Sequence, residues 1–175
     1  MRNTANSDLK DIFITAFNSG MRLSEIINLK WSSVHLSDRT LLIQNHSSFR
    51  TKNKKPRIIP LNNTLYHLLK SRKLKVIGME LNEYVFAKYF GVPYSVKFVG
   101  KGFKKIVRKL DLNSKYHFHL LRVAFGSNLL ANGIPISNIS KLLGHSSIAV
   151  TEKHYTSLSM ENLFNAVKTL DRNVV

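Results

Sequence analysis

The side chains in this sequence that could carry chemistry are Arg, Lys, His and Tyr. The chain has no cysteine, which excludes a disulfide scaffold, a thiolate metal site and a cysteine nucleophile. No pair of carboxylates is placed for a two-metal site, and no glycine-rich phosphate loop indicates the use of ATP. The remaining residue types suit chemistry on a phosphodiester.

Such chemistry needs no metal. Two arginines can each donate two hydrogen bonds to the oxygens of a phosphate as its negative charge increases. A lysine or a histidine can protonate the leaving oxygen. A tyrosine, whose ordinary pKa is about 10, becomes a nucleophile once a neighbouring group takes its proton. The sequence therefore predicts a reaction without a cofactor.

A metal site is the alternative interpretation of the histidines. His117, His119, His145 and His154 lie in one stretch of the chain. However, the chain lacks the HExxH pattern and has few carboxylates, and both features argue against zinc binding. We therefore predict no metal.

The charge of the chain indicates a polyanionic partner. It contains 27 Lys and Arg against 10 Asp and Glu, a formal net charge of +17 at pH 7. Residues 39–79 and 84–110 contain basic side chains and no acidic one. Double-stranded DNA is the first candidate partner, and an anionic membrane is the weaker one, since no basic amphipathic helix with a clear apolar face stands out. The candidate contacts to DNA are Arg50, Lys54, Lys55, Arg57, Lys101, Lys104 and Lys105.

The location predicted from the sequence is cytoplasmic. No apolar run approaches the ~18 residues of a membrane-spanning helix. Residues 1–10 are polar and lack the apolar core of a signal peptide. A DNA partner would further place the protein at the nucleoid of a prokaryotic cell.

Five short segments carry the candidate catalytic side chains in a fixed order. They are the segment around Arg22 with Glu25 three residues later, the basic segment 51–61 with Lys52, the box His119-Leu-Leu-Arg122, the segment Leu142-Leu-Gly-His145, and Tyr155 ten residues after His145. Each pattern alone is weak, whereas the order and the spacing together are specific. Over residues 18–157 they resemble the active-site motifs of the tyrosine recombinase (phage integrase) family.

The resemblance implies a set of phosphate ligands. Arg22 and Arg122 would hold the non-bridging oxygens of the scissile phosphate, and His145 would add a third donor. Glu25 would orient a basic partner from behind the site, and its alternative is an ordinary surface ion pair.

The resemblance also implies the groups that move protons and form the covalent bond. Tyr155 would attack phosphorus, leaving a 3′-phosphotyrosyl link and a free 5′-hydroxyl. Lys52 would protonate the 5′-bridging oxygen as a general acid. His119 would accept the proton of the tyrosine or position its hydroxyl.

The activity implied is site-specific DNA recombination, carried out by an integrase of a phage or other mobile element that assembles as a tetramer on DNA. A Xer-like recombinase that resolves chromosome or plasmid dimers is the nearest alternative. A type IB topoisomerase and a catalytically weak DNA-binding module with the same fold are two further ones.

These residues must be positioned by helices and strands, and the expected elements together indicate an α+β fold. It is mostly helical, with a small three-stranded antiparallel sheet. The helices expected from apolar spacing are residues 7–19, 23–30, 63–76, 96–110, 118–131, 135–143 and 162–170. The strands expected are residues 34–36, 41–45 and 57–60. Ser7 is the expected N-cap of the first helix, and Gly20 and Gly144 are the expected ends of theirs.

Residues 1–175 are expected to form one catalytic domain. The resemblance implies a separate helical DNA-binding domain ahead of it, and residues 1–7 leave no room for one. We therefore expect an excised catalytic domain or the product of a truncated gene. The helix expected at 162–170 has one apolar face, which could pack on its own domain or on a neighbouring protomer.

Overall fold

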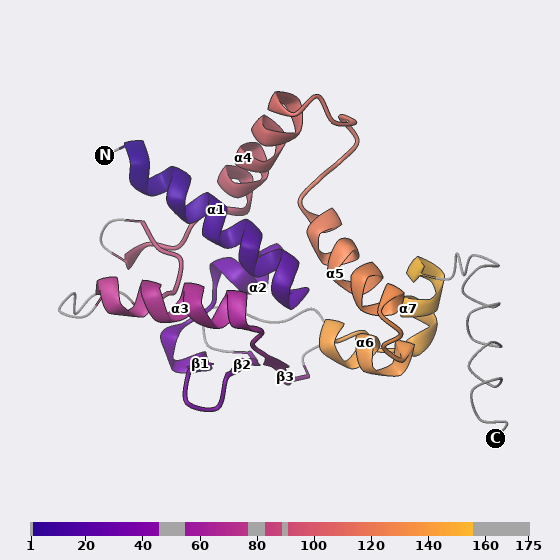
Figure 1. Cartoon of the computed structure of the whole chain (residues 1–175). Helices are drawn as coiled ribbons and strands as arrows, with labels where there is room; N and C mark the ends of the chain where they lie inside the picture. The colour runs from indigo at the N-terminus through magenta and orange to yellow at the C-terminus, as the bar shows by residue number, and fades with distance from the viewer. Residues whose placement is uncertain (1, 46–54, 77–82, 89–90, 156–175) are drawn as a thin grey trace, which may run out of the picture.

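The computed structural model describes residues 2–45, 55–76, 83–88 and 91–155 (Figure 1). The elements in chain order are α1 (Arg2–Ser19), α2 (Leu23–Ile27), a 3-10 turn (Trp31–Ser33), β1 (Val34–His35), β2 (Thr40–Ile43), β3 (Arg57–Pro60), α3 (Asn63–Val76), α4 (Val96–Lys109), α5 (His119–Ala131), α6 (Ile136–Leu143) and α7 (Ile148–Tyr155). None of the helices within these ranges is long and apolar enough to cross a membrane.

The larger part of the molecule is built on α1, which packs against α2, α3 and α5. Its buried face carries Ile12 and Ala16, which join the main hydrophobic core with residues of the sheet and of α3. The helix ends at Gly20, whose positive φ of 63° is typical of a left-handed helix end. This turn directs the chain straight into the segment that carries Arg22.

The sheet is antiparallel with strand order β1-β2-β3. Leu41 pairs with Ile59 and Ile43 pairs with Arg57, and the buried side chains alternate along β2 and β3. Because side chains alternate between the two faces of a strand, Arg57 lies on the same face as the buried Ile59. The sheet therefore directs a charged side chain toward the interior.

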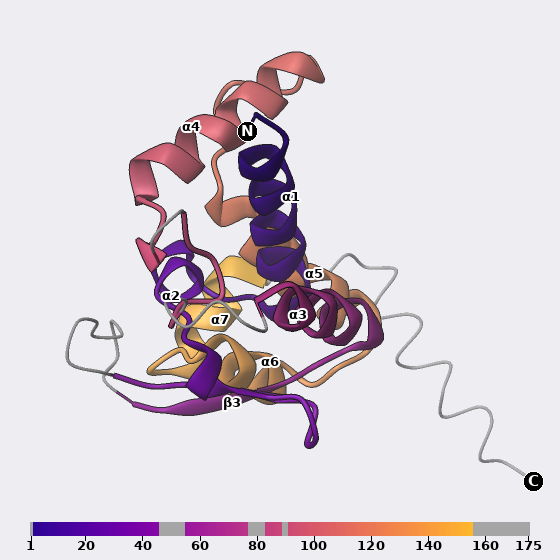
Figure 2. The ribbon, with the colours of Figure 1, turned by 90° about the vertical axis from the view of Figure 1, so that its left-hand side faces the viewer.

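The helices α5, α6 and α7 form a second lobe beside the sheet (Figure 1). A small apolar cluster holds this lobe together, with Ile139 and Leu143 at its centre. Figure 2 shows α6 lying next to β3, and the two elements are in contact. The contact brings the end of α6 to the sheet residue Arg57.

The predicted fold class is confirmed: the described chain is mostly helical, with a three-stranded antiparallel sheet. Several predicted details are wrong. The first helix begins at Arg2, so Ser7 lies inside it and is not its N-cap. The second helix ends at Ile27 rather than Lys30, and the sequence patterns do not predict α7. The predicted helix at 162–170 lies outside the described residues.

Candidate active site

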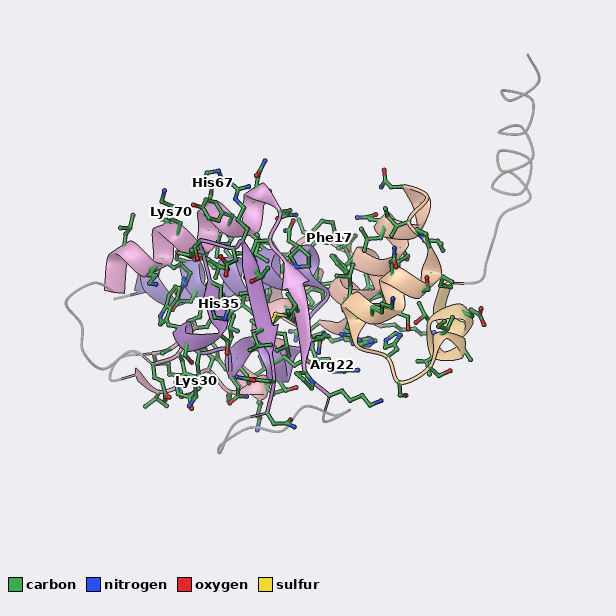
Figure 3. All side chains as sticks on the ribbon, turned by 90° about the horizontal axis from the view of Figure 1, so that it is seen from below. Phe17, Arg22, Lys30, His35, His67 and Lys70 are labelled. Atoms are coloured by element: carbon green, nitrogen blue, oxygen red, sulfur yellow. The ribbon has the colours of Figure 1, made fainter. Side chains whose placement is uncertain are left out.

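A cleft of about 320 Å³ lies where the start of α2, the start of β3 and the end of α6 meet. Its lining residues are Arg22, Lys55, Pro56, Arg57, Lys141, Gly144, His145 and Ser146. Figure 3 shows Arg22 at the boundary between the sheet and the α5–α7 lobe. Two predicted phosphate ligands, Arg22 and His145, thus share one strongly basic cleft.

Arg22 is held in place by Glu25. It is the N-cap residue of α2, with an extended backbone. Its backbone N–H donates to Glu25 Oε2 at 2.8 Å and its side-chain Nη1 donates to Glu25 Oε1 at 3.0 Å. The Arg22 side chain is 20% exposed and that of Glu25 is 1% exposed. The surface ion pair considered for Glu25 is therefore wrong, because its carboxylate is buried behind the cleft.

The carboxyl group of Glu25 stays ionised despite its burial. Burial by itself is the largest influence and raises the pKa, since it disfavours the charged form. Hydrogen bonds and charges from Arg57 and Arg22 act in the opposite direction, and together they hold the pKa below its ordinary value of 4.5. The negative charge of Glu25 is thus available to orient both arginines.

Arg122 joins the two halves of the site from inside the protein. It lies on α5 and is only 3% exposed. Its Nη1 donates to the carbonyl oxygen of Gly20 at 2.6 Å, and its Nη2 donates to that of Leu143 at 2.7 Å. Gly20 and Leu143 each precede a predicted ligand, Arg22 or His145, by two residues. Arg122 is not among the residues that line the cleft, and its predicted contact with the phosphate stays a prediction. Its two bonds fix the spacing of the backbones that form the cleft.

His145 follows the left-handed turn that ends α6. Gly144 has a φ of 64°, as predicted for a helix end at this position. The Nδ1 atom of His145 lies 2.7 Å from the Oγ1 atom of Thr151, which is fully buried on α7. Tyr155 is the last residue of α7, and its side chain lies outside the part of the chain that the structure describes. One hydrogen bond thus ties the turn that presents His145 to the helix that ends at Tyr155.

His119 lies outside this cleft. It is exposed at the start of α5 and lines a second groove of about 490 Å³, between α4 and α5. Leu23, directly after Arg22, lines the same groove. Arg22 lines the cleft and Leu23 lines the groove, so the cleft and the groove lie next to each other on either side of the start of α2.

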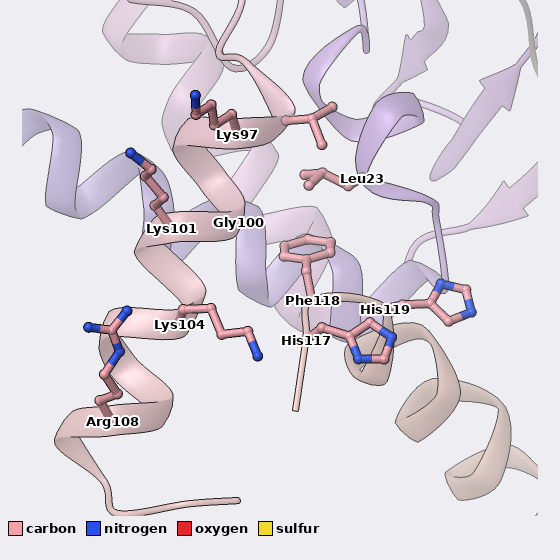
Figure 4. Close-up of a pocket in the computed structure, with 10 residues that line it drawn as sticks. Leu23, Lys97, Gly100, Lys101, Lys104, Arg108, His117, Phe118 and His119 are labelled. Atoms are coloured by element: carbon pink, nitrogen blue, oxygen red, sulfur yellow. The ribbon is translucent and has the colours of Figure 1, made fainter. Parts of the chain in front are cut away.

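One face of α4 lines this second groove with basic side chains (Figure 4). Lys101 and Lys104, two of the predicted DNA contacts, lie there together with Lys97 and Arg108. Lys97 and Arg108 are not among the contacts predicted from the sequence, although the spacing of 97, 101, 104 and 108 is that of one helix face. Lys105, also a predicted DNA contact, does not line this groove. It lines an apolar groove between α1 and α4.

Of the remaining predicted DNA contacts, the structure describes Lys55 and Arg57. Lys55 is exposed at the cleft, as expected of a DNA contact. Arg57 is different: its side chain is 9% exposed and its guanidinium donates to Glu25 and to Leu142. The structure thus gives Arg57 an internal role, and its predicted contact with DNA stays a prediction. The predicted DNA contacts Arg50 and Lys54 lie outside the described residues, as does the predicted general acid Lys52.

The described histidines do not form a cluster with acidic side chains. Within the described ranges, no three His, Asp or Glu side chains lie close enough together to hold a metal ion. His117 and His119 stack against each other with their ring centroids 6.3 Å apart.

Comparison with known proteins identifies the family. A sequence model of the phage integrase family matches residues 2–162. The chain belongs to the phage integrase family.

Curated relatives of this integrase-family chain are tyrosine recombinases. A XerC-like tyrosine recombinase from Caldanaerobacter subterraneus subsp. tengcongensis is 28% identical over 192 residues, covering 93% of this chain and 49% of the relative. Tyrosine recombinase XerC from Bacillus pumilus is 30% identical over 154 residues, covering 84% of this chain and 48% of the relative. The chain thus spans about half the length of these relatives.

Solved structures with the same fold include recombinases bound to DNA. The Tn1549 transposon integrase in complex with a circular intermediate DNA superposes with a TM-score of 0.76 at 18% identity, covering 97% of this chain and 64% of that one. The XerA recombinase superposes with a TM-score of 0.74 at 24% identity, covering 95% of this chain and 57% of that one. The integrase-family chain therefore has the fold of a tyrosine recombinase catalytic domain.

Proposed function

We propose that the protein is a site-specific tyrosine recombinase, which cuts and rejoins DNA through a phosphotyrosyl intermediate. The observation that carries the proposal is the cleft in which Arg22 and His145 meet, backed by Arg122 and Glu25. Family membership and the tyrosine recombinase relatives support the same activity.

In the proposed mechanism, a phosphodiester of DNA enters the cleft. Arg22 and His145 donate hydrogen bonds to its non-bridging oxygens, and Arg122 holds the geometry from beneath and contributes positive charge. These donors stabilise the extra charge of the pentavalent phosphorus, and they do so without rearranging because the backbone around them is fixed. The need for a fixed donor explains why an ionised Glu25 is buried behind the cleft: its carboxylate keeps Arg22 in one orientation.

The covalent step would involve Tyr155, His119 and Lys52. Lys52 and the side chain of Tyr155 lie outside the part of the chain that the structure describes, whereas His119 lines the groove next to the cleft. Oη of Tyr155 forms a bond to phosphorus as the bond from phosphorus to the 5′-oxygen breaks. The tyrosine proton passes to His119, and the departing 5′-oxygen takes a proton from Lys52. The energy of the broken bond is retained in the phosphotyrosyl link, so attack by a 5′-hydroxyl rejoins the strand by the reverse route.

Double-stranded DNA is the proposed partner. The basic face of α4 with Lys97, Lys101 and Arg108 lies beside the cleft, so it can hold phosphates next to the one being cut. Solved relatives are described in complex with DNA. Recombination joins two duplexes, which requires several protomers, and we propose a tetramer on DNA with residues 1–175 acting as the catalytic domain. Such a protein would work at the nucleoid, in the cytoplasm.

The subtype has two candidates that share this chemistry. Integration or excision of a mobile element is the first, and the likeness to the Tn1549 transposon integrase supports it. Resolution of chromosome or plasmid dimers is the second, and the XerC and XerD relatives favour it. Sequencing the DNA captured on the protein in cells would separate them, because one activity selects the ends of an element and the other a single site on a chromosome or plasmid.

Covalent trapping tests the activity itself. The protein is incubated, in the presence of a chelator, with a pool of nicked duplexes of randomised sequence that lose a short fragment when cut. We expect an adduct that resists denaturants, and we expect Tyr155→Phe to abolish it while leaving DNA binding unchanged. Tyr66→Phe is the matched control, since Tyr66 lies on α3 beside Arg39 and His67. An adduct that persists in Tyr155→Phe would refute the assigned nucleophile, and DNA binding without any adduct would indicate a non-catalytic module.

A further inference from the structure

Arg57 is a charged residue that the proposed chemistry does not use. Its Nη1 donates to Glu25 Oε1 at 3.0 Å and its Nη2 donates to Glu25 Oε2 at 2.7 Å, a bidentate pair. Its Nε donates to the carbonyl oxygen of Leu142 at 3.0 Å. One guanidinium thus bonds both to the helix α2 and to the end of the helix α6.

The sheet explains why this arginine points inward. Arg57 pairs with Ile43 in the register of β2 and β3, and it shares a face with Ile59. Ile43 is 4% exposed and Ile59 is 1% exposed. A cation on this face loses its hydration and must be paired, because an unpaired buried charge is strongly destabilising. Glu25 supplies the partner.

The carboxylate of Glu25 is saturated by two arginines. It accepts from the backbone N–H and Nη1 of Arg22, and from Nη1 and Nη2 of Arg57. These four hydrogen bonds match the four acceptor positions of a carboxylate. The orientation of Arg22 therefore depends on the position of Arg57, since both share the same two oxygen atoms.

The other end of Arg57 determines the position of the turn that carries His145. The adjacent carbonyl groups of Leu142 and Leu143 accept from Arg57 and Arg122 respectively. The last carbonyls of a helix have no partner within it, and they carry partial negative charge, so two cations suit this position. A Cβ atom on Gly144 would lie only 2.8 Å from Cδ of Arg57, so the side chain packs directly on the turn.

We propose that Arg57 is a positioning residue, which sets the distance between Arg22 and His145 so that both reach the same phosphate. It acts through Glu25 on one side and through the end of α6 on the other. The consequence for catalysis rests on the proposed function, whereas the coupling between the two elements does not. Lysine cannot replace Arg57, because an ammonium group cannot make the bidentate bond to Glu25 and the bond to Leu142 at once.

The experiment compares Arg57→Lys with Arg72→Lys. Arg72 is a matched control, since it is also partly buried, at 15% side-chain exposure, and donates to two carboxylates, of Asp8 and Asp11, and to the Val85 carbonyl. None of these residues lines the cleft. Both variants should lower the melting temperature. Only Arg57→Lys should slow adduct formation at saturating DNA, on the order of a hundredfold, the loss that a misplacement of about 1 Å brings.

A coupling test separates positioning from general damage. If Arg57 acts through Glu25, the effects of Glu25→Gln and Arg57→Lys on the rate of adduct formation should not be additive. The double variant should then form adduct at about the rate of the slower single variant. Dissociation constants for duplex DNA should change by less than about threefold. A loss of DNA affinity without a slower rate at saturation would instead make Arg57 a DNA contact, and would overturn the proposal.

A second measurement needs no catalysis. Backbone amide NMR spectra without DNA should show shifted signals for Gly144 and His145 in Arg57→Lys and unshifted ones in Arg72→Lys. Unshifted signals in both variants would refute the coupling. Should the unaltered protein form no adduct, the proposed function fails, and these spectra still decide whether Arg57 links α2 to the end of α6.

Discussion

The hydroxyl of Thr151 and the imidazole of His145 are joined by a hydrogen bond, with 2.7 Å between Oγ1 and Nδ1. Thr151 is fully buried on α7, four residues before Tyr155. The bond holds the His145 ring against the helix that ends at Tyr155, so the proposed phosphate ligand and the proposed nucleophile belong to one local unit. Such bonds to a ring nitrogen determine its orientation and which nitrogen carries the proton.

Thr151→Val should therefore slow adduct formation at saturating DNA more than it weakens DNA binding. Valine keeps the shape and removes the hydroxyl, which leaves a partly buried nitrogen of His145 without this partner, at a cost of about 1–3 kcal/mol. Thr151→Ser retains the hydroxyl and should recover most of the rate. Single-turnover adduct formation measures both, and equal rates for valine and serine would rule out the hydrogen bond as the cause.

Acid should destabilise the protein partly through Glu25. Its pKa is lowered in the folded state, so its contribution to stability is complete above its unfolded value near 4.5 and is lost as the pH falls through the folded value. Free energies of unfolding in urea, measured from neutral pH down into the acid range, should fall more steeply for the unaltered protein than for Glu25→Gln. The other carboxylates titrate in both proteins, so parallel curves would show that Glu25 makes no such contribution.

Gly144→Ala should be more destabilising than Gly133→Ala. Both glycines have a positive φ, 64° and 76°, which costs an alanine roughly 1–2 kcal/mol. A Cβ atom on Gly133 would meet open space, whereas one on Gly144 would lie 2.8 Å from Cδ of Arg57. The guanidinium of Arg57 is bonded at both ends, so the side chain cannot easily move away. Urea denaturation of the two variants measures the difference in the free energy of unfolding. Equal losses of stability would show that the Arg57 side chain moves to make room for the Cβ atom.

The basic face of α4 should control the salt dependence of DNA binding. In the double variant Lys97→Ala, Lys101→Ala, the slope of log Kd against log salt concentration should fall by about one for each phosphate that is no longer neutralised. The double variant Lys10→Ala, Lys109→Ala is the matched control, because Lys10 and Lys109 line the groove between α1 and α4 instead. Fluorescence anisotropy at salt concentrations from roughly 50 to 300 mM, which bracket physiological strength, measures the slopes. An equal change in the control would indicate a diffuse charge effect rather than a binding face.

Sequence patterns predict most of the elements and the proposed chemistry of this protein. The apolar spacing of residues 63–76 and the period of two at 57–60 predict α3 and β3 with their observed ends, because local periodicity and end signals are properties of the chain itself. Gly144 is predicted as a helix end on the same grounds. The order of the five motifs favours the proposed reaction class.

Tertiary structure alone decided which of the basic side chains are bonded to groups inside the protein. In the sequence, Arg57 belongs to the same basic segment as Lys55, and the pattern predicts that both contact DNA. Only the sheet register and the contact with α6 reveal that Arg57, which also lines the cleft, is bonded to Glu25 across 32 residues and to Leu142 across 85. The physical reason is that a cation's role depends on the acceptors that long-range packing brings to it, and no local pattern specifies them.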